Sequence, residues 1–501
     1  MILVLWCAIE AWLVQERTLM SPQAQGQVDP ILDRGLRFAF DLCAFTALVA
    51  FLPRLLLPFW FAGSALFYLV AMVYYETCRQ PLSVLVLLRR PEGAPLTAIT
   101  RAGLVPSHLV LFASYLLKLL LLFGLVHAGP DRSTGALALG AWLLLLVVVN
   151  AQYRPLGRIA AWETVGGLGA VYGYLPAWAA EYRWTEPTRL LERALARAGE
   201  GSDRLTPVET PAPIAHWMVF LQVERLDWAV LDFRIRGQEV TPQLNAQARR
   251  AMRYAVRPER CLGSSDADFI LLTGRTPSAD VPTYKIRGYP WTDTIVQRMT
   301  AMGFGTTAIH GASGDVFGRR SAFARMGFER LIFREEFEAL GPTPLAGWSV
   351  PDDDLLQFAA MDFAARSGRQ FQLAITATSQ PLFRNYDRGL ARFFPGATDQ
   401  AEQYFDVMHY VDQAIGHYLA ALPAETTVVL YGSRASGLEH RGTGYRSRPA
   451  GSPGLVPFLV LETGRDLSLL QRTGEEARDG TFTLQDAARW IHASLALQQV
   501  S

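Results

Sequence analysis

The pattern of hydrophobic and polar positions changes near residue 214. Before that point, apolar residues form long runs, which is typical of helices surrounded by apolar material. The runs cover residues 1–14, 38–52, 56–75, 104–125 and 136–149. A helix that crosses a bilayer needs about 20 mostly apolar residues. Residues 1–14 lack the basic leader of a signal peptide, so we count them as a span and predict a transmembrane region of about five helices over residues 1–153.

Three charged side chains, Glu10, Asp41 and Lys118, fall within these runs. Charge inside a membrane segment is a candidate functional site, and it is also common where a side chain faces another helix. We favour the second interpretation here.

Residues 154–213 form a connector between two differently patterned parts. Within it, 162–178 mixes Gly, Tyr and Trp with apolar residues, which suits a helix at a membrane interface. Residues 187–198 alternate Arg and Glu with Leu and Ala, which predicts a short amphipathic helix. The following stretch, 199–213, is rich in Gly, Pro and Thr and marks a domain boundary.

From residue 214 onward, short apolar runs alternate with helical patterns. Predicted strands cover 216–223, 306–310 and 371–376, and a fourth predicted strand begins the stretch 426–437. Predicted helices cover 268–273, 293–302 and 401–422. This alternation predicts an α/β domain over 214–501, with a mostly parallel sheet flanked by helices. Open sheets of this kind bind ligands at the carboxyl ends of their strands.

Charge and cysteine content exclude several classes of function. A net charge of +1 without a basic run gives no electrostatic basis for binding nucleic acid. The four cysteines include no CxxC spacing, so neither a disulfide framework nor a structural zinc site is expected. A chain of 501 residues is too long for one compact domain.

Eight segments carry a family resemblance. In order they read LQVER, GQEVTPQLN, GSSDADF, IHGASGDVFGRR, TSQP, YVDQAIG, VVLYGS and LVPFLV. Together they resemble the lipoteichoic acid synthase and phosphoglycerol transferase branch of the alkaline phosphatase/sulfatase superfamily. The resemblance implies a multi-pass protein of the inner (cytoplasmic) membrane with its C-terminal domain on the extracytoplasmic side. Arginines between residues 79 and 101 would favour the opposite orientation, but one loop is weaker evidence than eight segments.

The resemblance also implies a catalytic site. Active members hold one divalent cation with a strand-end glutamate, a threonine nucleophile and an adjacent aspartate and histidine. Such a cation lowers the pKa of the hydroxyl and neutralises phosphate charge. Glu224 matches the glutamate, and Ser264 replaces the threonine at a helix start that Ser264 or Ser265 is expected to cap.

The aspartate and histidine positions are the main departure from the family. They hold Ser433 and Arg434, a weak neutral ligand and a permanent cation. Glu224 and Ser264 alone are too few to hold Mn²⁺, Mg²⁺ or Zn²⁺, so we expect no bound cofactor. We expect Arg434 to occupy the metal position and to pair with Glu224, because a lone buried carboxylate is unfavourable.

The substrate side also differs in part from the family. The resemblance places Arg319 and Phe317 beside a phosphoglycerol head group, and it places Gln380 where active members have a histidine. A glutamine cannot shuttle a proton near neutral pH. His310 opens the same segment as Arg319, and we expect it to be structural. His440 follows the altered strand end and is a candidate displaced ligand.

Three functions remain open. The first, which we favour, is a pseudoenzyme that binds or scaffolds in envelope glycan or lipid-linked polymer assembly. The second is an active phosphoglycerol- or phosphoethanolamine-type transferase with Ser264 as nucleophile and Arg434 and Arg319 binding phosphate. The third is a transporter, motivated by Asp41 and Lys118 but disfavoured because the spans show no internal repeat. The expected partners are the lipid bilayer and a lipid-linked or glycan substrate or a polysaccharide assembly protein.

Overall fold

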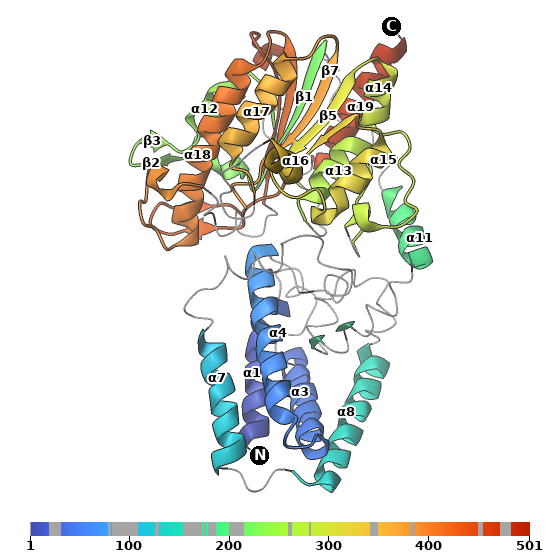
Figure 1. Ribbon diagram of the computed structural model, residues 1–501, viewed down its shortest axis with the longest axis vertical. Coiled ribbons are helices and arrows are strands. Elements are labelled where there is room, and N and C mark those ends of the chain that lie inside the picture. Colours follow the sequence, from blue (N-terminus) through green and yellow to red (C-terminus); the bar gives the residue numbers. More distant parts are fainter. Residues whose placement is uncertain are drawn as a thin grey trace. The chain divides into compact units, whose positions relative to one another are not determined.

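A computed structural model represents the 501-residue chain (Figure 1). The structure describes residues 2–19, 32–78, 82, 109–125, 130–153, 173–174, 177–178, 187–199, 215–258, 263–279, 282–340, 349–380, 383, 386–448, 454–470 and 482–500. The chain divides into two compact units, Met1–Arg189 and Leu190–Ser501, and each is described by itself.

The N-terminal unit is helical, and its helices coincide with the predicted apolar runs. They are α1 (Ile2–Leu19), α3 (Leu32–Phe51), α4 (Leu57–Cys78), α7 (Leu109–Leu120) with a π-helical turn (Leu121–Leu125), and α8 (Arg132–Tyr153). Within the described part of the chain, one helical stretch, Leu57–Tyr75, is long and apolar enough to cross a membrane. Val110–Phe123 and Arg132–Val148 are shorter apolar helices. Five spans therefore remain a prediction.

The charged residues of the apolar runs lie against neighbouring helices, as expected. Glu10 on α1 forms an ion pair with Lys118 on α7, and both side chains are buried. Gln15 Nε2 on α1 donates to Asp41 Oδ1 on α3 at 3.3 Å. These contacts tie α1 to two other helices of the unit.

The connector lies only partly within the described residues. Most of the predicted interfacial helix, 162–178, falls outside them. The predicted amphipathic helix is present as α11 (Pro187–Ala198). Its Arg197 donates to the carbonyl of Pro277 at 2.9 Å, so the helix packs on the C-terminal unit.

The C-terminal unit contains, within its described residues, a seven-stranded sheet. Its order is β4 (Met252–Val256), β11 (Val456–Glu462), β8 (Thr426–Gly432), β1 (Trp217–Val223), β7 (Gln370–Ile375), β5 (Gly305–His310) and β6 (Arg330–Ile332). The strands from β8 to β6 are parallel, while β11 runs antiparallel to both β8 and β4. The predicted mostly parallel sheet is confirmed. Two small antiparallel ribbons pair β2 (Arg234–Ile235) with β3 (Gln238–Glu239) and β9 (Glu439–His440) with β10 (Tyr445–Arg446).

Helices cover both faces of this sheet (Figure 1). One face carries α12 (Pro242–Ala248), α17 (Asp352–Ala364) and α18 (Gln400–Ala421), and α16 (Arg334–Ala339) packs beside α17. The other face carries α13 (Ser265–Thr273), α14 (Ile295–Ala301), α15 (Arg319–Met326) and α19 (Leu484–Val500). The predicted helices 293–302 and 401–422 correspond to α14 and α18 within two residues at each end.

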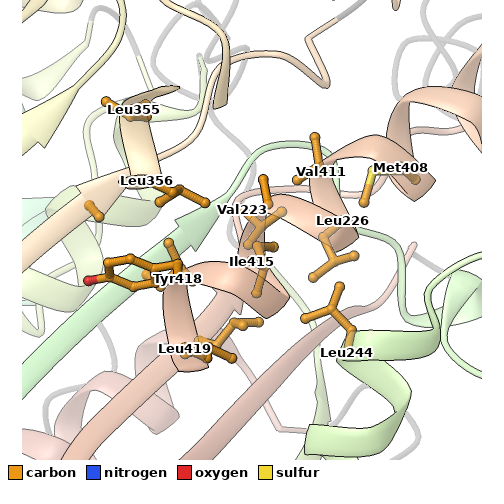
Figure 2. Close-up of a cluster of buried hydrophobic side chains, with 14 of the residues drawn as sticks. Val223, Leu226, Leu244, Leu355, Leu356, Met408, Val411, Ile415, Tyr418 and Leu419 are labelled. Atoms are coloured by element: carbon orange, nitrogen blue, oxygen red, sulfur yellow. The ribbon is translucent and has the colours of Figure 1, made fainter. Parts of the chain in front are cut away.

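The core under α18 explains which way the β1 side chains point. Figure 2 shows the apolar face of α18, including Ile415, Tyr418 and Leu419, against Val223 and Leu226. Each such side chain contributes about 1.5–3 kcal/mol when it is fully buried. Side chains alternate along a strand, so the residues on either side of Val223 point to the opposite face, towards α13.

Candidate functional site

The predicted site residues come together at the carboxyl edge of the sheet. Glu224 follows β1 and Ser433 follows β8, and these strands are in register at Val223 and Gly432. Gln380 lies on the loop after β7. Ser264 and Arg319 lie at the first turns of α13 and α15 on the same side of the sheet. This edge is where parallel sheets bind their ligands.

Neutral donors saturate the Glu224 carboxylate, which has no solvent exposure. Its Oε2 accepts from Gln380 Nε2 at 2.5 Å and from Ser433 Oγ at 2.9 Å. Its Oε1 accepts from Gln222 Nε2 at 3.2 Å, and the same Gln222 nitrogen donates to the Ser264 carbonyl at 3.2 Å. Amide and hydroxyl groups thus provide the hydrogen bonds that a buried carboxylate requires.

The described bonds of Glu224 involve Gln222, Gln380 and Ser433, and the pairing of Arg434 with Glu224 remains a prediction. Arg434 is buried, with 6% of its surface exposed. Gln380, expected on the substrate side, contacts Glu224 instead.

Arg319 is held by a buried ion pair. Its Nε and Nη2 donate to Asp268 Oδ2 and Oδ1 at 3.0 and 2.9 Å, and both residues are almost fully buried. The Tyr284 hydroxyl donates to Asp268 Oδ2 at 3.1 Å. Burial opposes the charge on Arg319, but the Asp268 carboxylate raises the pKa of the guanidinium. The cation expected to meet a head group is therefore already neutralised by a two-point contact.

His310 orients this arginine as a neutral ring. Its Nδ1 lies 2.9 Å from the carbonyl of Ile375 and therefore carries the proton. Its Nε2 accepts from Arg319 Nη1 at 3.3 Å. Burial, followed by the charge of Arg319, lowers the pKa of His310 to about 3. The geometry agrees with a structural role.

Ser264 lies at the N-cap position of α13, but its side chain does not cap the helix. Its Oγ instead accepts from Arg319 Nη2 at 3.4 Å. The helix begins at Ser265, earlier than the predicted residue 268, and Asp266 Oδ2 accepts from the Gly263 amide at 3.1 Å. Among the described residues, the hydrogen bonds of Ser264 Oγ include no general base, and a guanidinium cannot accept its proton.

Phe317 closes over the start of α13. Its φ of 60° is strained for a residue with a side chain. The Arg319 guanidinium carbon lies 5.4 Å from the centre of its ring. A Cβ at Gly263 would lie 2.8 Å from the ring, so only glycine allows this approach.

The donor set does not fit a divalent cation. Glu224, Ser264 and Ser433 provide one carboxylate and two hydroxyls, whereas protein sites for Zn²⁺ or Mg²⁺ combine several anionic or imidazole ligands. Over the described ranges, no group of three or more His, Cys, Asp or Glu side chains could hold a metal ion. Ser433 and Arg434 stand at the positions where the resemblance expects the missing ligands.

His440 lies in a different contact. Its Nδ1 is 2.9 Å from Thr443 Oγ1, and its Nε2 is 3.6 Å from Glu402 Oε1 on α18. The ring is therefore engaged at the β9–β10 ribbon and with α18. These two contacts place the ring with Thr443 and Glu402, neither of which is a predicted site residue.

Our sequence interpretation missed Asp227. This buried carboxylate accepts from the Ser436 amide at 2.6 Å, from Ser436 Oγ at 2.5 Å and from Ser447 Oγ at 2.9 Å, and it also accepts from the Tyr445 hydroxyl. Burial raises its pKa above the usual range. Asp227 thereby holds the segment that follows Arg434. An acidic residue inside the apolar context LDWAV was the available signal.

Comparison with known proteins agrees with this architecture. The family profile "Sulfatase" matches residues 217–471. The lipoteichoic acid synthase-like protein YvgJ of Bacillus subtilis (strain 168) is 19% identical over 211 residues, which cover 42% of this chain and 34% of that protein. The chain thus matches about a third of the length of this curated relative.

One solved structure shares the fold over nearly the whole chain. The integral membrane lipooligosaccharide phosphoethanolamine transferase A (EptA) of Neisseria meningitidis is similar over 99% of this chain and 95% of its own, with a TM-score of 0.60 and 14% identity. The lipoteichoic acid synthase LtaP of Listeria monocytogenes is similar over 54% of this chain and 75% of its own, with a TM-score of 0.45 and 17% identity. Because the sulfatase profile matches about half of the chain, the protein belongs to the sulfatase family of the alkaline phosphatase/sulfatase superfamily, and its curated match is lipoteichoic acid synthase-like.

Proposed function

We propose that this protein is a membrane-anchored sulfatase-family protein that has lost metal-dependent phosphotransfer. It serves as a binding or scaffolding component in the assembly of an envelope glycan or a lipid-linked polymer. The apolar helix Leu57–Tyr75 and the fold likeness to an integral membrane protein support the anchor. In this proposal the C-terminal unit lies on the extracytoplasmic side of the inner membrane.

One observation carries the proposal: among the described residues, the donors that bond the strand-end carboxylate are neutral groups. Gln222, Gln380 and Ser433 satisfy both oxygens of Glu224. A divalent cation would have to break these bonds inside a buried site. It would also meet the permanent charge of Arg434, which follows directly in the chain and repels cations.

The first test measures bound metal in the purified full chain. By elemental analysis we expect fewer than roughly one divalent ion per ten chains, because too few anionic ligands are present. The double variant Ser433→Asp/Arg434→His restores the carboxylate and the imidazole. It is expected to gain about one ion per chain.

The matched control adds Glu224→Gln to that double variant and is expected to lose the ion again. The proposal fails if the unmodified chain holds one divalent ion per protein and Glu224→Gln releases it.

A second candidate is an active transferase of the phosphoglycerol or phosphoethanolamine type. It is favoured by the position of Ser264, which lies at the N-terminus of α13 and accepts from Arg319 at 3.4 Å. Helix N-termini and guanidinium groups both stabilise anions. EptA is by its name a phosphoethanolamine transferase, and the fold of this chain resembles it.

Mass spectrometry of the full chain separates the two candidates. After incubation with phosphatidylglycerol or phosphatidylethanolamine, the transferase would carry a phospho-adduct on Ser264, and Ser264→Ala would not. We expect no adduct and unchanged lipid. An adduct on Ser264 would support the transferase and contradict the proposed binding role.

A further inference from the structure

A cluster of titratable side chains lies buried in the N-terminal unit, independent of the site above. Cys7 and Glu10 come from α1, Asp41 from α3, Tyr68 from α4 and Lys118 from α7. Charge interactions connect Tyr68 with Asp41, Glu10 and Cys7, and they connect Cys7 with Lys118 and Glu10. Four helices therefore bring ionisable groups to one place inside the unit.

Several oxygens in this cluster have no hydrogen-bond donor. Lys118 pairs with one oxygen of Glu10, but Glu10 Oε1 is buried and unpartnered within the described part of the chain. Asp41 Oδ2 and Gln15 Oε1 are also buried and unpartnered there. Glu10 and Gln15 are 8% and 4% exposed. Leaving such an acceptor unsatisfied costs about 1–3 kcal/mol.

The kind of atom left unpartnered shows which kind of hydrogen-bonding group is missing. The three atoms named above, from Glu10, Gln15 and Asp41, are acceptors, so these three side chains lack a hydrogen-bond donor. The Gln15 amide cannot turn over to supply one, because its nitrogen must face the Asp41 carboxylate that it contacts at 3.3 Å. A proton on a carboxylate turns an acceptor into a donor and removes a buried charge in the same step.

Charge balance points to Asp41. Glu10 has Lys118 as its counter-ion, and Glu16 has Arg34 and Arg37. Asp41 forms no ion pair with the described residues, although the charge of Arg37 acts on it through space.

Glu16 gives the cluster a route to water. Its side chain is 25% exposed, and that of its partner Arg34 is 39% exposed. Arg37, which contacts Glu16, is the neighbour whose charge also reaches Asp41. Polar groups therefore lead from the half-exposed Glu16 inward to Asp41.

We propose that Asp41, with Glu10 and Tyr68, forms a proton-binding site inside the helical unit. One proton from water at the Glu16 end adds to Asp41 Oδ2. The carboxylate becomes a carboxylic acid, and the charge of the unit rises by one. Uptake is reversible and couples the packing of α1 and α3 to pH. Lys118 and Arg37 repel a metal cation at this place, so the proton is the occupant.

The experiment is infrared difference spectroscopy of the full chain in lipid nanodiscs as pH is varied. The carbonyl band of protonated carboxylic acids should grow with decreasing pH in the unmodified chain, and Asp41→Asn should lack the component that Asp41 contributes, seen as the difference between the two chains. Asp131→Asn is the matched control, because the exposed Asp131 caps the start of α8 through Thr134. It should leave the band unchanged.

Tyr68→Phe keeps Asp41 and tests the cluster without removing the carboxylate. It should shift the midpoint of the band by about one pH unit, which is about tenfold in proton concentration. A titrating band as large in Asp41→Asn as in the unmodified chain would overturn the proposal. So would a midpoint that moves when sodium replaces choline in the buffer, because that would assign the site to a metal cation.

Discussion

At the scale of single residues, the site shows how a few substitutions change its chemistry. Ser433 does more than fill the place of a metal ligand, because its hydroxyl bonds the carboxylate that a metal would need. Gln380 does the same from the opposite loop. Arg319 and Asp268 neutralise each other beneath them. These side chains bond to one another through both neutral and charged hydrogen bonds.

The Arg319–Asp268 pair gives a stability prediction. Arg319→Met leaves the Asp268 carboxylate buried without its counter-ion and is expected to cost about 3–5 kcal/mol in the free energy of unfolding. Adding Asp268→Leu should recover most of that loss, because no buried charge is then left unpaired. Chemical denaturation of the single and double variants measures both values. Equal losses in the two variants would contradict the pairing.

His310 gives a pH prediction. Its pKa falls from 6.5 to about 3 on folding, so the unfolded chain binds a proton that the folded chain does not bind between these values. This contribution to stability is full above pH 6.5 and is lost as pH falls towards 3. The slope is about 1.4 kcal/mol per pH unit for one proton.

The variant His310→Asn isolates the contribution of His310 to the pH dependence of stability. We compare the unfolding free energies of both chains between about pH 4 and 7. In roughly this interval the unfolded chain takes up the histidine proton. We expect the slope of unfolding free energy against pH to be smaller in the variant by the contribution of one proton. Parallel curves would show that His310 takes up its proton at the same pH in the folded and the unfolded chain.

At the scale of elements, a buried carboxylate holds the segment after β8. Asp227 accepts from Ser436, Ser447 and Tyr445 and ties this segment to the end of β1. Several donors on one carboxylate make Asp227 a fixed point for this segment.

Asp227→Ala should therefore loosen residues 434–447 more than it disturbs the sheet. The donors left unpaired cost about 1–3 kcal/mol in stability. Hydrogen exchange with mass spectrometry should show faster exchange in this segment and little change in β7. Tyr445→Phe, which removes one donor, should have a smaller effect. Uniform exchange over the whole unit would contradict a local anchor.

At the scale of the whole molecule, the chain divides into two compact units. The helical unit packs an apolar cluster that includes Leu57 and Phe61, and the C-terminal unit builds a core under α18. The described members of each of these two clusters come from one unit.

Residues 190–501 are therefore expected to fold without the helical unit. Circular dichroism of this fragment should show a cooperative thermal transition and mixed helix and strand content. A fragment without a cooperative transition would show that the sheet depends on the N-terminal helices.

The sequence by itself determined several elements, among them β1, β5, β7, β8, α14 and α18, because buried strands and amphipathic helices follow from the period of apolar residues. It also determined that Glu224, Ser433 and Arg434 follow strand ends at one edge, since strand ends of a parallel sheet meet there, whereas the place of Ser264 came from the family resemblance. Only the tertiary structure decided the partners: Gln380 and Ser433 for Glu224, and Asp268 for Arg319. Hydrogen-bond pairing depends on distances of a few ångströms between loops far apart in the chain, and periodicity carries no information about them.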